Sequence, residues 1–189
     1  MRTFFAIDLS PDCKKRLSAY MHTLAENFTV HFEKDRFRWM KPQNLHLTLQ
    51  FIGQLQEEDL TRLLLEVRKE LLEQKAFYLK LTNLEWFPSI NAPHVLSMQA
   101  NEHQRLANLA KLIGKGIATC NYNVEKRPYK GHVTLARLEN INNVSEEILK
   151  KFSAIELPEI FVKEIVFFRS EADMDGSRYT KLASLELLS

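Results

Sequence analysis

The sequence predicts an α+β fold built from two similar lobes that share a groove. Strand-like and helix-like segments alternate along the 189 residues, and 45% of the residues are apolar, enough for a full core. The segments NLHLTLQFIG at 44–53 and KGHVTLARL at 130–138 carry the same His-x-Thr pattern, one in each half of the chain. Each lies between predicted helices, which indicates a coarse internal repeat. We therefore expect residues 1–189 to form one bilobal domain.

The first quarter of the chain predicts a strand, a helix and two further strands. RTFFAIDL at 2–9 is typical of an opening strand. The helix predicted over 10–28 has Ser10 as a suitable N-cap and Pro11 at its first position. Its apolar stripe is expected to comprise Leu17, Met21, Leu24 and Phe28. Strands are expected at 36–40 and 45–53, separated by Lys41 and Pro42.

The middle of the chain predicts a second helix followed by two strands. The helix over 57–74 starts with acidic residues and contains no breaker. Its expected inward residues, at helical spacing, are Leu60, Leu64, Val67 and Leu71. The segments 77–87 and 94–100 are strand-like and are joined around Pro88 and Pro93.

The last third repeats this alternation. A helix is predicted over 101–120, although its two glycines weaken the final turns. Its expected inward residues are Leu106, Leu109, Ile113 and Ile117. A strand at 131–138 and a short helix at 143–152, with Ser145 as its cap, follow. The segments 159–172 and 178–188 predict a closing hairpin that turns around Asp175 and Gly176.

Composition narrows the class of partner. A formal net charge of +2 with mixed signs favours a small anionic ligand over duplex DNA. Cys13 and Cys120 lack a C-x-x-C spacing, so we expect free thiols. The N-terminus does not resemble a secretory signal, and no apolar run is long enough to span a bilayer. We expect a soluble, cytoplasmic protein, and a monomer because no coiled-coil pattern is present.

Strand geometry places the polar residues of each repeated motif on one face. Because side chains alternate along a strand, His46 shares a face with Thr48, and His132 shares one with Thr134. Two imidazoles facing one groove can act as general base and general acid near neutral pH, while hydroxyls donate to an anion between them. This set suits cleavage of a phosphodiester. The symmetry of the motifs leaves open which histidine is the acid.

The histidines also allow two other interpretations. A single His-x-Thr in a strand is more often a hydrogen-bonded structural histidine than a catalytic one, and only its repetition shifts that balance. A metal site would need three or four converging ligands, and threonine is a poor one. The remaining histidines lack the motif and are expected to be solvated or structural: His22, His31, His94 and His103.

The repeated motifs resemble a known family. LHLTLQFIG and GHVTLAR are similar to the paired H-x-T-x signatures of the two-histidine (2H) phosphoesterase superfamily, and specifically of its RNA 2',3'-cyclic phosphodiesterases, formerly described as 2'-5' RNA ligases. The opening MRTFFAIDL, the block at 36–53, RPYKGHVTLARL and the ending at 166–187 follow the family's order, so the resemblance covers nearly the whole chain. Gly131 departs from it, because many members have proline before the second histidine.

The resemblance implies a fold, an activity and a set of roles. The fold would be two pseudo-symmetric lobes of antiparallel sheet with helices outside and the active-site groove between them. His46 matches the proton donor, His132 the proton acceptor, and Thr48 and Thr134 the hydroxyls that hold phosphate. The enzyme would convert RNA or nucleotide 2',3'-cyclic phosphates to 2'-phosphomonoesters without a metal or cofactor, with weak 2'-5' ligation as the reverse reaction.

Arg137 and Phe5 are the expected substrate-binding residues. Arg137 matches a phosphate-contacting arginine, but it lies five positions after His132, so strict alternation would turn it away from the groove unless a bulge intervenes. Phe5 is a candidate for stacking on the base. Lys126, Arg127 and Lys130 are either RNA-steering residues or ordinary solvated charges. Two alternatives remain: a nucleotide- or RNA-binding module with little turnover, and a metal-dependent hydrolase.

Overall fold

The computed structural model describes residues 1–142, 144–152, 155–174 and 176–189. Strands and helices alternate along these residues, with three short 3₁₀ turns between them. In chain order the elements are β1 (Arg2–Asp8), α1 (Pro11–Phe28), β2 (Phe37–Trp39), β3 (His46–Gln54), α2 (Leu60–Leu71), β4 (Phe77–Leu79), β5 (Leu81–Phe87), β6 (Val95–Ala100), α3 (His103–Thr119), β7 (His132–Leu138), α4 (Glu146–Lys150), β8 (Ile160–Val162), β9 (Glu164–Asp173) and β10 (Gly176–Glu186).

The main sheet of the described chain consists of two halves that meet at the motif strands. Its order is β10-β9-β1-β3-β7-β6-β5, with β2 added beside β7. Neighbouring strands are antiparallel, and β3 and β7 are joined through a single pair of residues, Leu47 and Val133. Two antiparallel half-sheets therefore meet at the centre of the molecule, and the α+β fold with two similar halves is confirmed.

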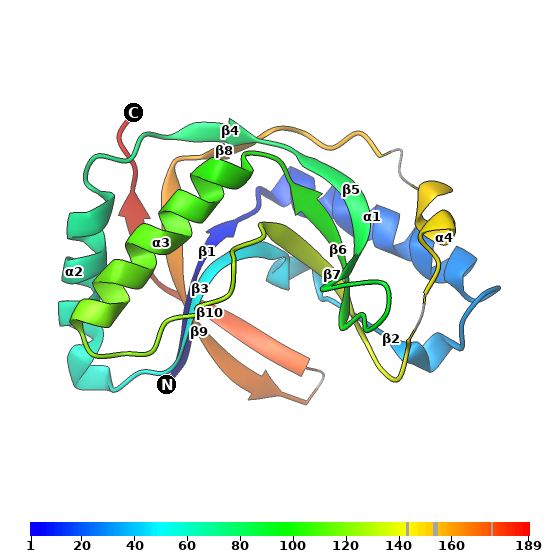
Figure 1. The fold of residues 1–189 in the computed structure, drawn as a ribbon, viewed down its shortest axis with the longest axis horizontal. Helices are drawn as coiled ribbons and strands as arrows, with labels where there is room; N and C mark the ends of the chain where they lie inside the picture. Colours follow the sequence, from blue (N-terminus) through cyan, green and yellow to red (C-terminus); the bar gives the residue numbers. More distant parts are fainter. Residues whose placement is uncertain (143, 153–154, 175) are drawn as a thin grey trace.

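Helices pack at the two ends of this sheet (Figure 1). Helices α2 and α3 lie side by side at one end, and α1 and α4 lie toward the other. Helix α1 begins as predicted, because the Ser10 hydroxyl accepts a hydrogen bond from the Cys13 backbone N–H at 3.2 Å and Pro11 follows it. The four residues of its predicted stripe are all buried. Helix α1 thus covers the core face of the sheet, opposite the face that the motif histidines use.

The apolar stripe of α2 differs from the predicted one. The residues that are fully buried are Leu63, Val67 and Leu71, whereas Leu60 and Leu64 are half-buried at the margin. The helix also starts at Leu60, after a 3₁₀ turn, so Leu60 lies at its N-terminal end. The inward stripe of α3 is confirmed at all of its four predicted positions: Leu106, Leu109, Ile113 and Ile117.

The C-terminal hairpin is confirmed and completes the first half of the sheet. Strand β9 pairs with β1 and with β10, so the two ends of the chain share one half-sheet. Gly176 opens β10, whereas Asp175 lies outside the described residues. Cys13 and Cys120 are buried free thiols, as predicted. None of the helices in the described chain is long and apolar enough to cross a membrane.

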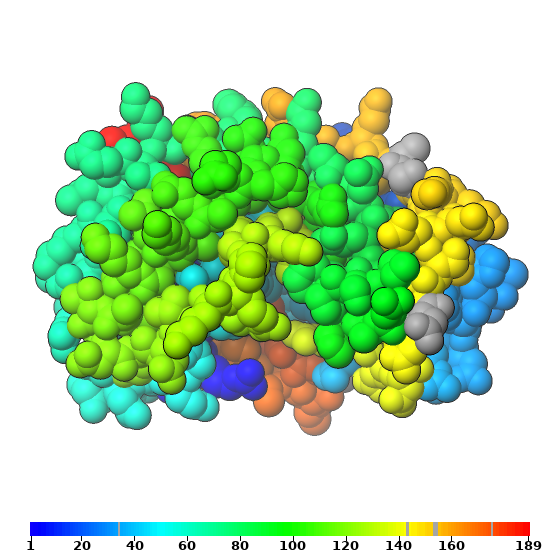
Figure 2. Space-filling model, in the orientation of Figure 1, coloured from blue at the N-terminus to red at the C-terminus, as the bar shows by residue number. Residues whose placement is uncertain are grey.

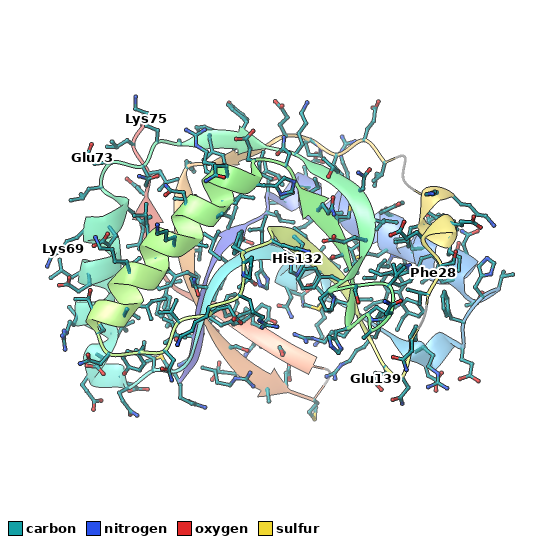
Figure 3. The ribbon with its side chains drawn as sticks, viewed as in Figure 1. Phe28, Lys69, Glu73, Lys75, His132 and Glu139 are labelled. Atoms are coloured by element: carbon teal, nitrogen blue, oxygen red, sulfur yellow. The ribbon has the colours of Figure 1, made fainter. Side chains whose placement is uncertain are left out.

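The segment between α3 and β7 lies over the middle of the molecule in Figure 2, between α3 and the loop that joins β5 to β6. It leads directly into the second motif, and Figure 3 shows His132 at the centre, at the start of β7. The strand entry is held by a hydrogen bond from the Ala100 N–H to the Gly131 carbonyl at 3.0 Å. Glycine in place of proline therefore leaves this entry tied to β6.

Candidate active site

The junction of β3 and β7 brings the two His-x-Thr motifs together. Leu47 and Val133 are cross-strand partners, so they point to the same face, and both are fully buried. Their flanking residues must point to the opposite face. These flanking residues are the four predicted catalytic residues: His46, Thr48, His132 and Thr134. All four are half-buried, as expected for side chains that line a groove.

His46 is held on both ring nitrogens. Its Nδ1 lies 2.6 Å from the Asn44 carbonyl oxygen, and its Nε2 lies 2.9 Å from the Thr48 hydroxyl. A carbonyl can only accept, so Nδ1 carries the proton, and Nε2 of the neutral ring accepts from Thr48. Phe4 and Tyr179 enclose the ring, with centroids at 4.9 and 5.2 Å. His46 is therefore oriented with Nε2 toward the motif face.

His132 repeats half of this arrangement. Its Nδ1 lies 2.9 Å from the Lys130 carbonyl oxygen, two residues earlier, as Asn44 is two residues before His46. The ring stacks on Phe87, with centroids 4.3 Å apart. Among the described residues, nothing hydrogen-bonds to its Nε2. The two histidines thus present the same nitrogen, but only that of His132 is open to an incoming molecule.

Burial gives His46 an unusual proton affinity. Removal from water lowers its pKa from 6.5 to about 4, against the opposing effects of the Asn44 carbonyl and the Asp8 carboxylate. The Lys14 ammonium and, to a smaller extent, the nearby His132 lower the His46 pKa further. His46 is consequently neutral at neutral pH in the free protein. An anion bound beside it would raise this pKa.

The lowered pKa of His46 predicts that acid destabilises the fold. The unfolded chain takes up this proton below about pH 6.5, whereas the folded chain takes it up only below about pH 4. Between these values the unfolded state binds more protons, so the contribution of His46 to the free energy of unfolding falls as the pH falls and levels off below pH 4. This group accounts for a loss of about 3 kcal/mol over that window. Urea unfolding at a series of pH values would measure the slope.

Two variants isolate this contribution. His46→Gln removes the titrating group and is expected to flatten the slope between pH 6.5 and about 4. His22→Gln, at an exposed position on α1, is the matched control and should keep the slope of the parent. A slope that is the same in the parent and in His46→Gln would contradict the assignment.

Both motif strands contain a bulge at the same place. Along β3, Ala6 pairs with Thr48 and Phe5 with Gln50, which leaves Leu49 as the extra residue. Along β7, Ser97 pairs with Thr134 and Leu96 with Ala136, which leaves Leu135 as the extra residue. Each bulge lies three residues after its histidine and reverses the alternation that follows. The internal repeat therefore extends to the irregularity of the backbone.

The bulges decide which later residues face the groove. Arg137 and Phe51 each lie five residues after a motif histidine, and the bulge returns both to the histidine face. The bulge that the sequence required for an inward Arg137 is present. Phe51 is the counterpart of Arg137 in the first motif, and 61% of its surface is exposed. Its ring offers a flat apolar surface of the kind on which nucleobases stack.

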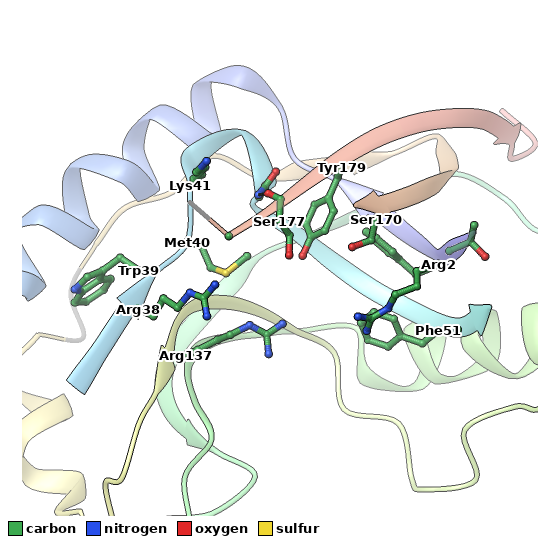
Figure 4. A pocket seen from close by; sticks show the side chains of 15 residues that line it. Arg2, Arg38, Trp39, Met40, Lys41, Phe51, Arg137, Ser170, Ser177 and Tyr179 are labelled. Carbon is green, nitrogen blue, oxygen red and sulfur yellow. Dashed lines mark hydrogen bonds between the residues drawn. The ribbon is translucent and has the colours of Figure 1, made fainter. Parts of the chain in front are cut away.

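A cavity of about 470 Å³ lies beside His46 on this face. Phe4, Asn44 and Tyr179, which contact or flank His46, are among its lining residues. Figure 4 shows the guanidinium groups of Arg38 and Arg137 side by side, pointing into the cavity, with Arg2 and Phe51 at the other end. The site thus combines imidazoles, hydroxyls, guanidinium groups and aromatic rings, a set suited to a nucleotide phosphate.

The stacking role predicted for Phe5 is wrong. Phe5 has no exposed surface, because its ring packs against Phe167 in the core at 4.4 Å between centroids. Its neighbour Phe4 faces His46 instead. The site residues that the sequence did not indicate are Arg2, Phe4, Arg38, Phe51, Phe87 and Tyr179. The equal offsets of Phe51 and Arg137 from their histidines were the one available signal.

The other histidines lie outside the cavity, and the described chain contains no cluster of metal ligands. The four remaining histidines are exposed, as expected, and none lines the cavity: His22, His31, His94 and His103. In residues 1–142, 144–152, 155–174 and 176–189, no three His, Cys, Asp or Glu side chains converge as metal ligands. Arg127 pairs with Glu125 at 2.6 Å on the surface.

Comparison with known proteins finds the same family twice along the chain, in agreement with the internal repeat of the two His-x-Thr motifs. A family model described as LigT-like phosphoesterase matches residues 7–97 and, a second time, residues 96–179. An RNA 2',3'-cyclic phosphodiesterase of Aquifex aeolicus is 29% identical over 150 residues, covering 76% of this chain and 78% of that protein. One of Archaeoglobus fulgidus is 25% identical over 186 residues, covering 98% and 100%.

Solved structures show the same architecture. Escherichia coli LigT complexed with 3'-AMP superimposes with a TM-score of 0.70 at 25% identity, covering 100% of this chain and 98% of that one. The Thermus thermophilus protein TT0787 gives a TM-score of 0.73 at 24% identity, covering 99% and 98%. Since the two consecutive matches to the family model together span residues 7–179, this chain belongs to the LigT-like phosphoesterases of the 2H superfamily.

Proposed function

We propose that this phosphoesterase opens 2',3'-cyclic phosphates at RNA ends and leaves 2'-phosphomonoesters. The main support for this proposal is that the two His-x-Thr motifs lie on one face of the sheet. In both histidines, the Nδ1–H group donates to a backbone carbonyl. This arrangement directs both Nε2 atoms to the groove. Base and acid can then act on the two apical oxygens of one phosphorus atom, which is what hydrolysis of a cyclic diester requires.

The free Nε2 of His132 suits the general base. It takes a proton from water, the water oxygen forms a bond to phosphorus, and the bond from phosphorus to O3' breaks. His46, protonated once the anionic substrate raises its pKa, gives its Nε2 proton to O3'. Thr48, Thr134 and Arg137 donate to the phosphoryl oxygens. If the 5'-hydroxyl of a second RNA takes the place of water, its oxygen forms the bond to phosphorus while the bond to O3' breaks and O3' takes the proton of His46, which gives weak 2'-5' ligation.

The relatives support the choice of substrate. Those from Aquifex aeolicus and Archaeoglobus fulgidus are RNA 2',3'-cyclic phosphodiesterases, and the Escherichia coli LigT structure contains 3'-AMP. In this chain the exposed ring of Phe51 supplies the stacking surface that Phe5 lacks. Stacking tolerates different bases, which suits an enzyme that acts on varied RNA ends.

The test is hydrolysis of an oligonucleotide that ends in a 2',3'-cyclic phosphate, with EDTA in excess. We expect turnover that EDTA does not affect and a product with a 2'-phosphate, identified by mass and by comparison with synthetic 2'- and 3'-phosphate standards. Loss of activity in EDTA would favour the metal-dependent hydrolase. Tight binding of the oligonucleotide without turnover would favour the RNA-binding module.

Arg137 is expected to contribute through its charge and its fork of donors. Arg137→Ala should lower kcat/KM for the cyclic phosphate by about 10- to 100-fold, the usual value of a charged hydrogen bond. Arg137→Lys keeps the charge but loses the bidentate geometry and should recover only part of this loss. Unchanged hydrolysis in Arg137→Ala would disprove phosphate contact by this residue.

A further inference from the structure

Two arginines stand opposite each other on neighbouring strands inside the cavity. Arg38 of β2 is the direct cross-strand partner of Arg137 of β7. Both side chains line the cavity, and Figure 4 shows their guanidinium groups side by side. Like charges in directly opposed positions destabilise a sheet. An anion between or beside them would remove that repulsion.

Neither arginine has a carboxylate partner within the described part of the chain. The contrast with nearby arginines is clear, because Arg36 pairs with Glu33 at 2.7 Å and Arg16 with Asp12 at 3.0 Å. In the described chain, five arginines outside the cavity each pair with an acid, at positions 16, 36, 127, 169 and 178, whereas the cavity pair does not. Unpaired guanidinium groups in a concave site favour the recognition of phosphate.

One phosphate does not account for both arginines. A cyclic phosphodiester has two non-bridging oxygens and a single negative charge. The proposed reaction already directs the hydroxyls of Thr48 and Thr134 and the guanidinium of Arg137 to these oxygens. The five donors of Arg38 would remain without an acceptor. The Arg38 guanidinium is thus available for a second anion next to the first.

The cavity has room for more than one phosphate. Its volume of about 470 Å³ falls within the range of roughly 300–1,000 Å³ that is usual for organic ligands. Met40 supplies apolar lining between the arginine pair and Lys41, and Trp39 lies on the other side of Arg38. Alternation of cationic and aromatic or apolar groups is typical of grooves that follow a single nucleic acid strand.

We propose that Arg38 binds the internucleotide phosphate on the 5' side of the terminal nucleotide, so that the enzyme acts on oligonucleotide ends in preference to single nucleotides. This inference rests on the proposed function, because the cyclic phosphate fixes the position of the neighbouring phosphate. The chemical class of the substrate follows: a single-stranded oligoribonucleotide with at least one phosphodiester upstream of its cyclic end.

The test compares two dinucleotides that both end in a 2',3'-cyclic phosphate. One has a natural internucleotide phosphate, and the other has an uncharged methylphosphonate in its place. The parent enzyme should show a kcat/KM at least about tenfold higher for the charged linkage, the value expected of a charge-assisted contact. Arg38→Gln should lose this preference. Arg16→Gln removes an equal charge from the outer surface of α1 and should keep it.

The outcomes separate the two proposals. If the parent hydrolyses both dinucleotides equally well, the second phosphate site is disproved, while the cyclic phosphodiesterase activity stands. If Arg38→Gln slows both dinucleotides by the same factor, Arg38 acts only through Arg137 or through the fold, and the site is again disproved. If the parent opens neither cyclic end, the proposed function itself is wrong, and the inference that rests on it falls as well.

Discussion

Replacement of either motif histidine by alanine is expected to lower the rate of cyclic phosphate hydrolysis by about 10²- to 10⁴-fold, the usual contribution of a positioned acid or base. The reason is geometric, because the Nδ1 atom of each ring is bonded to a backbone carbonyl and both motif histidines lie on the same face of the sheet. kcat/KM for an oligonucleotide with a cyclic end measures the loss. The double variant His46→Ala/His132→Ala should lose much less than the product of the single losses, since the pair acts as a unit.

The control is a histidine outside the groove. His103→Ala, at an exposed position at the start of α3, should keep the parental rate. Because His46 also packs against Phe4 and Tyr179, urea unfolding of each variant would show whether the fold persists. Folded variants of His46 and His132 that retain the parental rate would refute the two-histidine mechanism.

A substrate with a better leaving group separates the two roles. The substrate is a nucleoside 2'-phosphate esterified with nitrophenol. Its leaving group, nitrophenolate, is a stable anion that needs little protonation when its bond to phosphorus breaks. His46→Ala should therefore be nearly as active as the parent on this compound, whereas His132→Ala should stay impaired because water must still be activated. The opposite pattern would exchange the roles of acid and base.

The local sequence is sufficient to predict the motif histidines and most helices. A period of two in an apolar segment determines which side chains share a face, so the sequence alone groups His46 with Thr48. Helix α1 is equally accessible, because Ser10 and Pro11 mark its start by their own backbone and side-chain chemistry. These features depend on neighbours within a few positions along the chain.

Features that depend on distant pairing were not predictable. Strand β1 reads as five consecutive buried residues, so its sequence could not tell Phe5, which faces the core, from Phe4, which faces His46. Arg38 joins the site only because β2 pairs with β7, a contact between segments far apart in the sequence. The bulges at Leu49 and Leu135 are likewise set by the registers of the neighbouring strands.

The glycines of α3 are explained by helix packing and not by a weak helix end. A Cβ atom at position 116 would lie 2.7 Å from the Cα and 2.8 Å from the backbone nitrogen of Val67 on α2. Contacts of that length with backbone atoms cannot be relieved by rotating a side chain. Gly116 therefore permits the close approach of α2 and α3. From the sequence alone, this glycine was expected only to weaken the end of the helix.

Gly116→Ala is expected to destabilise the protein by about 1–3 kcal/mol, the usual cost of overpacking. Helix propensity alone predicts the opposite sign, since alanine is favoured over glycine by about 1 kcal/mol in a helix interior. Overpacking prevails because the clash is with the backbone of α2, so the two helices must move apart. The free energy of unfolding in urea, followed by circular dichroism at neutral pH, measures the difference.

Gly114→Ala is the matched control on the same helix. Its Cβ would lie 2.8 Å from Val124 Cγ1 and 3.2 Å from Gln50 Nε2, which are side-chain atoms that can shift. Its loss of stability should be clearly smaller than that of Gly116→Ala. Gln50 also donates to the Ala110 carbonyl at 3.1 Å, so α3 supports β3 directly behind the first motif. A Gly116→Ala variant as stable as the parent would mean that the contact between α2 and α3 yields easily.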